Sequence, residues 1–304
     1  MATQRSAWAG VLTVPFLLLL FAAAVPAQDF SSVEIRTEKV AEGIHALFGR
    51  GGNIAVSTGP DGVFMIDDQY APLTDKIRAA VAAISAAPVR FVLNTHWHGD
   101  HTGGNENFGE AGAVLVAHQN VRKRLSSGQL LEFFDRQVPP APGGALPVVT
   151  FTEDLTFHLN GDEISVFHVG PAHTDGDAVV HFKKARVVHM GDTYFNGLYP
   201  FIDLSSGGSV HGVIASVDRV LATVDDAARI IPGHGPLSDV SELRSYRYML
   251  ATVRDRIQGQ IKAGNPLEKV IESRPTAEFD ARLGGGFIKP EQFVEIVYRS
   301  LAGE

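Results

Sequence analysis

The chain contains no cysteine among its 304 residues. Disulfide bonds and thiolate metal ligands are therefore excluded, and any metal site has to be built from histidine and carboxylate side chains. Basic residues are few relative to acidic ones, 26 against 34, which leaves a formal net charge of −8. Because no stripe of basic residues interleaved with aromatics occurs either, nucleic acid is not an expected partner.

Two common catalytic motifs are also missing. There is no Gly-x-Ser-x-Gly nucleophile motif, and no glycine-rich phosphate loop follows a predicted strand. What is present is the composition of a globular protein, with 45% apolar and 20% charged residues. The chemistry therefore has to be sought among histidine and carboxylate side chains.

The first 27 residues have the composition of an export signal. Arg5 is their only charge, the apolar run spans residues 11–24, and residues 25–27 fit a small-residue cleavage site. The run is shorter than the ~20 residues that cross a bilayer, although an uncleaved membrane anchor remains the alternative. We predict a signal peptide over residues 1–27, a mature chain over residues 28–304, and an exported, periplasmic product with no stable membrane insertion.

Hydrophobic periodicity predicts strands and helices in alternation through both halves of the chain. The strongest local signal is Asn160-Gly161 between two alternating runs, which is typical of a hairpin turn. A segment rich in proline and glycine, residues 139–147, is interpreted as a loop between two halves of one domain. Strands are expected at 44–48, 53–57, 63–66, 89–93, 114–117, 155–159, 163–169, 178–182, 187–190 and 229–231, and helices at 74–86, 118–125, 210–223, 241–262 and 291–301.

Four potential metal ligands occupy six positions directly after the predicted strand 89–93. His96 and His98 point to one side, because side chains of an extended chain repeat every second residue. Asp100 and His101 follow on a turn that Gly99 permits, and they add an oxygen and a nitrogen donor. The spacing predicts a loop that could serve two metal ions.

Three further candidates each follow a predicted strand and are flanked by glycine or proline: His173, Asp192 and His234. Turn or capping roles explain such residues when they occur singly. Their recurrence at strand ends, where a rigid scaffold presents functional side chains, favours one site shared with the histidine-rich loop.

With this set of residues the chain resembles the metallo-β-lactamase-fold hydrolase superfamily over nearly all of its mature length. The resemblance implies an α/β fold, a four-layer αβ/βα sandwich, with two metal ions, usually zinc, at one edge of the sheets. Iron or manganese could replace zinc, because histidine and carboxylate sites suit several divalent ions. By motif position, His96, His98 and His173 would hold the first metal, Asp100, His101 and His234 the second, and Asp192 would bridge them.

Such a site predicts an enzyme that hydrolyses a small-molecule substrate. Zinc lowers the pKa of bound water to ~7, so that hydroxide is available to attack the carbonyl of an ester, lactone, thioester or amide. Asp100 is the candidate catalytic residue that orients this hydroxide. The sequence leaves the natural substrate and the oligomeric state open.

Three alternatives stay open. Export would suit a β-lactamase, but Asp192 stands where the best-known subclass has cysteine, and residues 193–200 contain no cation to bind a drug carboxylate, so weak or no β-lactam turnover is expected. Phosphodiester or sulfate-ester hydrolysis uses similar ligands. A non-catalytic metal-binding protein is the third.

Several other polar residues have undecided roles. Asp67 ends a predicted strand and could accept a hydrogen bond from a ligand histidine. Three residues that follow Asp192 could contact substrate, with loop packing as the alternative: Tyr194, Asn196 and Tyr199. His118 and His211 each begin a predicted helix and could support a ligand or line the pocket.

Overall fold

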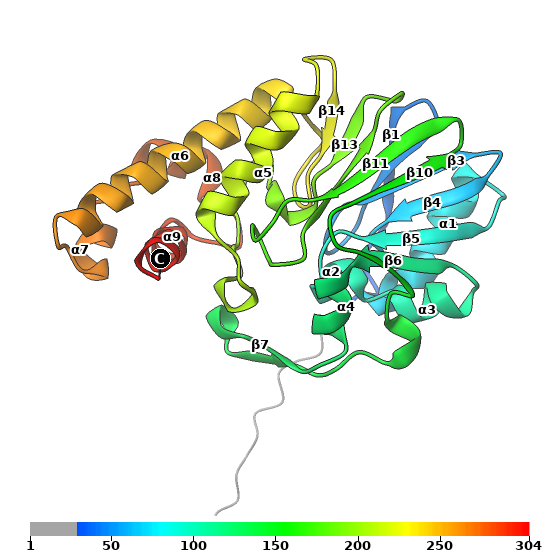
Figure 1. The fold of residues 1–304 in the computed structure, drawn as a ribbon, viewed down its shortest axis with the longest axis horizontal. Helices are drawn as coiled ribbons and strands as arrows, with labels where there is room; N and C mark the ends of the chain where they lie inside the picture. The colour runs from blue at the N-terminus through cyan, green and yellow to red at the C-terminus, as the bar shows by residue number, and fades with distance from the viewer. Residues whose placement is uncertain (1–28, 304) are drawn as a thin grey trace, which may run out of the picture.

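The computed structural model describes residues 29–303, so the predicted signal peptide lies outside the described residues. The described chain forms two β-sheets packed face to face, with helices on both outer faces (Figure 1). This is the four-layer αβ/βα arrangement expected from the sequence. None of the helices between residues 29 and 303 combines the length and apolarity that crossing a membrane requires.

The first sheet comes from the N-terminal half and has seven strands in the order β1-β2-β3-β4-β5-β6-β9. Short turns join β1 to β4, which pair antiparallel, whereas β4, β5, β6 and β9 pair parallel through helical crossovers. The strands are β1 (Arg36–Ala41), β2 (Ile44–Phe48), β3 (Ile54–Gly59), β4 (Gly62–Ile66), β5 (Val89–Asn94), β6 (Val114–His118) and β9 (Val149–Phe151), and the helices are α1 (Thr74–Ile84), α2 (Gly99–Thr102), α3 (Asn105–Glu110) and α4 (Gln119–Leu125).

The second sheet has six strands in chain order. Its first hairpin turns at Asn160 and Gly161, whose φ angles of 53° and 72° are the left-handed values that the Asn-Gly pair predicts. Strands β13 and β14 run parallel, with α5 between them. The elements are β10 (Asp154–Leu159), β11 (Asp162–His168), β12 (Ala178–Phe182), β13 (Val187–His189), α5 (Val210–Thr223), β14 (Arg229–Ile231) and β15 (Ser238–Asp239).

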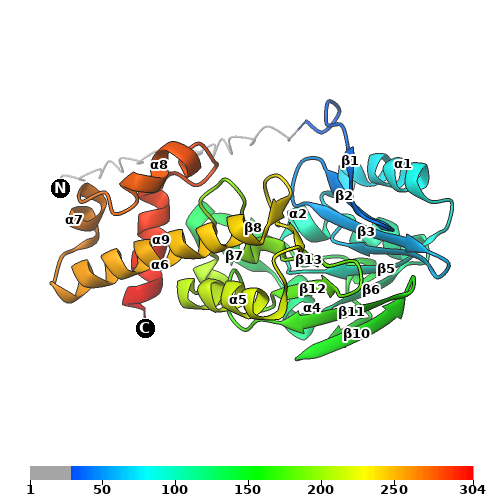
Figure 2. The same ribbon diagram turned by 90° about the horizontal axis from the view of Figure 1, so that it is seen from above.

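A helical segment ends the chain, and Figure 2 shows α7 and α8 lying beyond the ends of the sheets. Its helices are α6 (Val240–Lys262), α7 (Leu267–Glu272), α8 (Ala277–Leu283) and α9 (Pro290–Ala302). The sequence analysis did not predict α7, α8 or the hairpin of β7 (Gln129–Leu131) and β8 (Arg136–Val138), because these elements are too short to show a clear period. Single 3₁₀ turns are η1 (Ala71–Leu73), η2 (Glu132–Phe134), η3 (Gly143–Ala145), η4 (Gly191–Thr193) and η5 (Leu204–Ser206).

The core is divided by the alternation of side chains along each strand. In β4, Phe64 and Ile66 pack between the two sheets, whereas Val63 and Met65 pack under α1 and α3. In β12, Val180 faces the first sheet and Val179 faces the helices of the opposite layer. Each strand therefore contributes to two apolar layers, which holds the strand ends in place.

Candidate metal centre

All seven predicted ligands lie at one edge of the two sheets. Because β4 and β5 run parallel, as do β13 and β14, the C-terminal ends of each pair lie at the same edge. His96 and His98 follow β5, Asp192 follows β13 and His234 follows β14, while His173 lies in the loop between β11 and β12. The parallel register thus brings together side chains that are up to 138 positions apart in the sequence, from His96 to His234.

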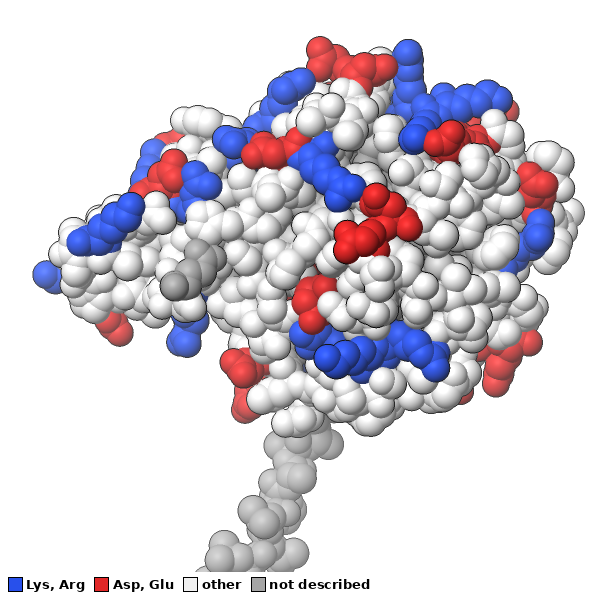
Figure 3. Space-filling view, viewed as in Figure 1, with Lys and Arg blue, Asp and Glu red and all other residues white. Residues whose placement is uncertain are grey.

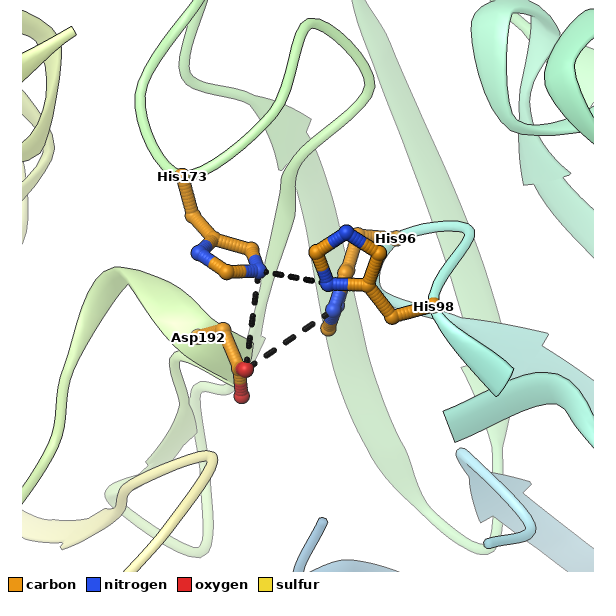
Figure 4. A group of neighbouring side chains, drawn as sticks. All are labelled: His96, His98, His173 and Asp192. Atoms are coloured by element: carbon orange, nitrogen blue, oxygen red, sulfur yellow. Dashed lines mark hydrogen bonds and ion pairs between the residues drawn. The ribbon is translucent and has the colours of Figure 1, made fainter. Parts of the chain in front are cut away.

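His96, His98, His173 and Asp192 form the first group, whose ligand atoms all lie within 4.8 Å of one another (Figure 4). Nε2 of His173 is 2.9 Å from Nδ1 of His98 and 3.6 Å from Oδ2 of Asp192. Nε2 of His96 is buried without a hydrogen-bond partner. A buried polar atom without a partner is costly, and a divalent metal ion would satisfy it, so these residues fit a metal.

Asp100, His101 and His234 form the second group, again with ligand atoms within 4.8 Å. Nε2 of His234 is 3.3 Å from Oδ2 of Asp100 and 3.4 Å from Nε2 of His101. Asp192 reaches this group as well, with Oδ1 3.1 Å from Nε2 of His101 and Oδ2 3.3 Å from Nε2 of His234. Its carboxylate therefore lies between the two groups, as a bridging ligand would.

The outer ring nitrogen of three histidines is held by an oxygen atom. Nδ1 of His101 is 2.7 Å from Oδ2 of Asp67, and Nε2 of His98 is 3.0 Å from Oδ2 of Asp203. Nδ1 of His173 donates to the main-chain oxygen of Phe201 at 2.8 Å. A hydrogen bond at one nitrogen orients the ring and leaves the other nitrogen free to bind a metal.

Asp67, which directly follows β4, is hydrogen-bonded to the segment after β5 that carries His96, His98, Asp100 and His101. It accepts hydrogen bonds from the main-chain nitrogen of Thr95 at 2.7 Å and from its hydroxyl at 2.8 Å. That hydroxyl lies 3.1 Å from Nδ1 of His96. The predicted hydrogen bond between Asp67 and a ligand histidine is confirmed, whereas Asp203 was not predicted because no motif surrounds it.

Burial and charge divide the histidines into two kinds. Burial lowers the pKa of His96 well below its ordinary value and lowers the pKa of His173 to about 4. Burial also acts against a charge on His101 and His234, but Asp192 and nearby carboxylates outweigh it, raising the pKa of His101 well above its usual range and that of His234 to about 9. The first group is thus ready to bind a cation at neutral pH, while the second must first release protons.

Two glycines let the backbone approach the ligands closely. A Cβ atom on Gly52 would lie 2.0 Å from Cε1 of His101, and one on Gly233 would lie 2.1 Å from Oδ1 of Asp192. No side chain fits at either position. The two segments are joined by a hydrogen bond of 2.7 Å from the main-chain nitrogen of Asn53 to the oxygen of Gly233.

The ligands open onto a cleft of about 460 Å³. Four of the predicted ligands are part of its lining: His98, Asp100, Asp192 and His234. Apolar side chains come from the hairpin, from the loop after η4 and from the segment between α8 and α9. The remaining lining residues are Arg50, Gly51, Tyr70, Leu131, Phe134, Arg136, Phe201 and Phe287.

The residues after Asp192 pack within the protein instead of lining the cleft. The hydroxyl of Tyr194 is 2.6 Å from Oγ of Ser238, and the hydroxyl of Tyr199 donates to Oδ1 of Asp280 at 2.9 Å. Asn196 donates to the main-chain oxygen of Pro236 at 3.2 Å. None of these three residues lines the cleft beside the metal ligands, and their contacts favour packing, the second of the two roles considered.

The two histidines with undecided roles also lie outside the cleft lining. His118, expected to begin a helix, is the last residue of β6, and its side chain caps α4 by accepting from the nitrogen of Asn120. It stacks on His168 with 3.9 Å between ring centroids. His211 lies in the first turn of α5.

Comparison with known proteins points to one family. A model of the metallo-beta-lactamase superfamily matches residues 47–234 of the chain. Every predicted ligand lies within that range, from His96 to His234.

Curated relatives that match parts of the chain share 24–32% identity with it. They include the 2,4-dinitroanisole O-demethylase subunit alpha of Nocardioides sp. (strain JS1661), 29% identical over 146 residues, which are 46% of this chain and 40% of that protein. The probable metallo-hydrolase YqgX of Bacillus subtilis is 28% identical over 192 residues, 58% of this chain and 85% of that protein. The acyl-coenzyme A thioesterase MBLAC2 of Gallus gallus is 28% identical over 180 residues, 53% of this chain and 64% of that protein. The chain thus spans less than two thirds of the first and third relatives.

Solved structures show the same fold. The DIM-1 metallo-beta-lactamase aligns with a TM-score of 0.59 at 21% identity, covering 72% of this chain and 99% of that one. The named relatives include hydrolases, in agreement with the predicted class of enzyme.

Proposed function

The chain belongs to the metallo-beta-lactamase superfamily, and we propose that it is a dinuclear zinc hydrolase acting on an ester, lactone, thioester or amide. The observation that carries the proposal is the convergence of two groups of His and Asp ligands, joined by Asp192, at the bottom of a cleft. The thioesterase and metallo-hydrolase among the relatives support the reaction class.

In this proposal each ligand is assigned to the metal ion that its position in the family motif implies. When bound, two such ions polarise a carbonyl oxygen and make water a nucleophile at neutral pH. Iron or manganese would suit the same donors. The first ion would be held by His96, His98 and His173, the second by Asp100, His101 and His234, and both by Asp192.

Asp100 is the residue proposed to orient the attacking water. Although burial opposes its ionisation, His101 and His234 hold the pKa of its carboxyl below the usual value. The carboxylate therefore remains an acceptor at neutral pH, and 23% of its side chain is exposed toward the cleft. An acceptor at this position fixes one hydrogen of the water and turns a lone pair toward the substrate.

The apolar side of the cleft fits the carbon-rich part of an acyl substrate. Leu131, Phe134, Phe201 and Phe287 line it. Such side chains exclude water and strengthen electrostatic interactions at the reacting atoms. We also propose that the protein acts after export to the periplasm, a proposal supported by the composition of residues 1–27.

A substrate panel on the zinc-loaded full chain tests the proposal. Aryl esters, lactones, thioesters, aryl phosphates and a cephalosporin would be compared, with zinc counted by elemental analysis. We expect about two zinc ions per chain and turnover within the acyl group of substrates. Asp100→Asn should lower kcat by roughly 10²-fold or more, as loss of a positioned acceptor predicts.

Each other outcome selects a different function. Fewer than about one zinc per chain after loading would overturn the metal assignment. Turnover of aryl phosphates alone would select a phosphodiesterase, efficient cephalosporin hydrolysis would select a β-lactamase, and bound zinc without any turnover would select a metal-binding protein.

A further inference from the structure

Two arginines in the cleft wall, Arg50 and Arg136, form no ion pair with a carboxylate within residues 29–303. Arg50 lies between β2 and β3, and Arg136 begins β8. Arg50 donates to the main-chain oxygen of Asp29 at 3.4 Å and lies over the ring of Phe30. Hydrogen bonds from Ser31 lower the pKa of the Asp29 carboxyl, and the charge of Arg50 acts in the same direction without forming an ion pair with it.

Two other arginines of this protein, Arg124 and Arg247, are each paired with a carboxylate. Arg124 donates to both oxygens of Asp175 at 2.7 and 2.8 Å, and Arg247 donates to both oxygens of Asp218 at 2.9 and 3.1 Å. Figure 3 shows basic and acidic side chains intermixed on one face, with a row of basic side chains over α4. Arg124 is a residue of this helix. The cleft arginines differ because their charge is left available beside the metal ligands.

Arg50, Arg136 and Tyr70 line the same cleft as Asp100. A Cβ atom on Gly51 would lie 3.0 Å from the main-chain oxygen of Asp100 and 3.2 Å from Cε2 of Tyr70, so the Arg50 segment touches both residues. Burial and Asp100 raise the pKa of Tyr70 to about 12, with Arg136 and Arg50 acting in the opposite direction. The Tyr70 hydroxyl thus remains a neutral donor, and both arginines lie close enough to affect it.

We propose that Arg50 and Arg136 bind an anionic group of the substrate and that Tyr70 donates a hydrogen bond to it. This proposal rests on the proposed hydrolase function and narrows its substrate class. Guanidinium groups suit carboxylate and phosphate oxygens because their N–H groups match these oxygens in pairs. The substrate is an acyl compound whose apolar part contacts Phe134 or Phe201 and whose carboxylate or phosphate lies within a few carbon atoms of the scissile carbonyl.

Matched esters with one leaving group test this directly. 4-Nitrophenyl pentanoate is neutral, the mono-4-nitrophenyl ester of glutaric acid carries a carboxylate at the same chain length, and 4-nitrophenyl 4-phosphonobutyrate carries a phosphonate. For the zinc-loaded full chain we expect kcat/KM for an anionic ester to exceed that for the neutral ester by roughly tenfold or more, mostly through KM. Comparison of the two anionic esters shows whether the site prefers a carboxylate or a phosphate-like group.

The variants Arg50→Gln and Arg136→Gln should each reduce the ratio of anionic to neutral kcat/KM by roughly threefold or more, and the double variant should remove the preference. Arg90→Gln is the matched control, because Arg90 is exposed on β5 and donates to the main-chain oxygen of Asp61 away from the cleft. That variant should leave the ratio unchanged. A preference that is absent from the parent protein, or that survives in the double variant, overturns the proposal.

Failure of the hydrolase function would be distinguishable from failure of the anion site. If no ester is turned over, glutarate is titrated calorimetrically into the metal-free full chain, where it has no metal to ligate. Saturable binding that Arg50→Gln and Arg136→Gln weaken at least tenfold, and that weakens with added salt, supports the anion site by itself. Absence of such binding overturns it.

Discussion

At the scale of single residues, the hydrogen bond at one ring nitrogen of a histidine decides which nitrogen is left to face the other metal ligands. His98 turns Nδ1 toward the first group because Nε2 contacts Asp203, whereas His101 and His173 turn Nε2 inward because Nδ1 is engaged elsewhere. These hydrogen bonds hold the rings in the geometry of a metal site before any ion arrives. The cost of removing them should therefore appear in metal affinity.

Asp203→Asn should weaken zinc binding at the first group by about 10- to 100-fold. Hydrogen bonds from His98, Ser205 and Ser206 overcome the effect of burial and lower the pKa of Asp203, so the native acceptor is a carboxylate. An amide would orient the His98 ring less strongly. Competition with a chelating dye measures the change, with Asp154→Asn on the exposed end of β10 as control; equal affinities for both variants would contradict this role.

Zinc loading at pH 7 should release at least one proton per chain from the second group. His101 and His234 have raised pKa values, the latter of about 9, so protonation of this pair is favoured at pH 7 in the metal-free protein, and a protonated ring must lose its proton to become a ligand. His96 and His173 have lowered pKa values and release none. Affinity at the second group should therefore fall as the pH drops below 9.

Calorimetry in buffers of different ionisation enthalpy measures this release. Binding enthalpies that do not depend on the buffer would contradict the prediction.

At the scale of the elements, the strand ends hold the site because strands are anchored on both faces. Phe64 in β4 is 1% exposed, and its ring centroid is 4.8 Å from that of Phe157 in the opposite sheet. Asp67 follows β4 by one residue and orients His101. The packing of β4 between the sheets therefore fixes the position of Asp67 and, through it, the orientation of His101.

Phe64→Ala should destabilise the protein by about 3–5 kcal/mol, the usual cost of removing a buried aromatic ring. Thermal unfolding of the metal-free chain measures this, and a folded variant should also bind zinc more weakly because β4 carries Asp67. Val148→Ala is the control, since Val148 is 72% exposed and such a change costs within about 0.5 kcal/mol. Equal unfolding temperatures for the two variants would refute the role of this layer.

At the scale of the whole molecule, the metal centre joins the two sheets. His96, His98, Asp100 and His101 follow a strand of the first sheet, and the other ligands belong to loops of the second. Ions bound to both sets would resist separation of the sheets. We therefore expect metal binding and folding to be coupled.

Zinc at a hundredfold excess over its Kd should stabilise the fold by ~2.7 kcal/mol per ion, which corresponds to a rise in Tm of about 5–10 °C for a chain of this size. Removal of zinc with a chelator should reverse the shift. His98→Ala should lose most of it, and an unchanged Tm in the parent protein would contradict the predicted site.

Much of the centre was predictable because its signal is local. His-x-His spacing after a strand turns two rings to one side whatever the rest of the fold does, and glycine or proline beside His173, Asp192 and His234 marked strand ends. The structure brings all seven residues together, and their roles as ligands remain a prediction that the metal measurements test. The hairpin at Asn160-Gly161 was predictable for the same local reason.

The sequence by itself determined the alternating strands and helices, the histidine-rich loop and the absence of thiolate ligands. Only the tertiary structure placed Asp203 behind His98 and brought Arg50 and Arg136 into the lining of one cleft. No cation lies in residues 193–200, and the arginines that line the cleft come from distant hairpins. Periodicity and motif spacing report on neighbours along the chain, whereas these contacts depend on how two sheets pack, and that packing is decided by the complementary shapes of buried side chains.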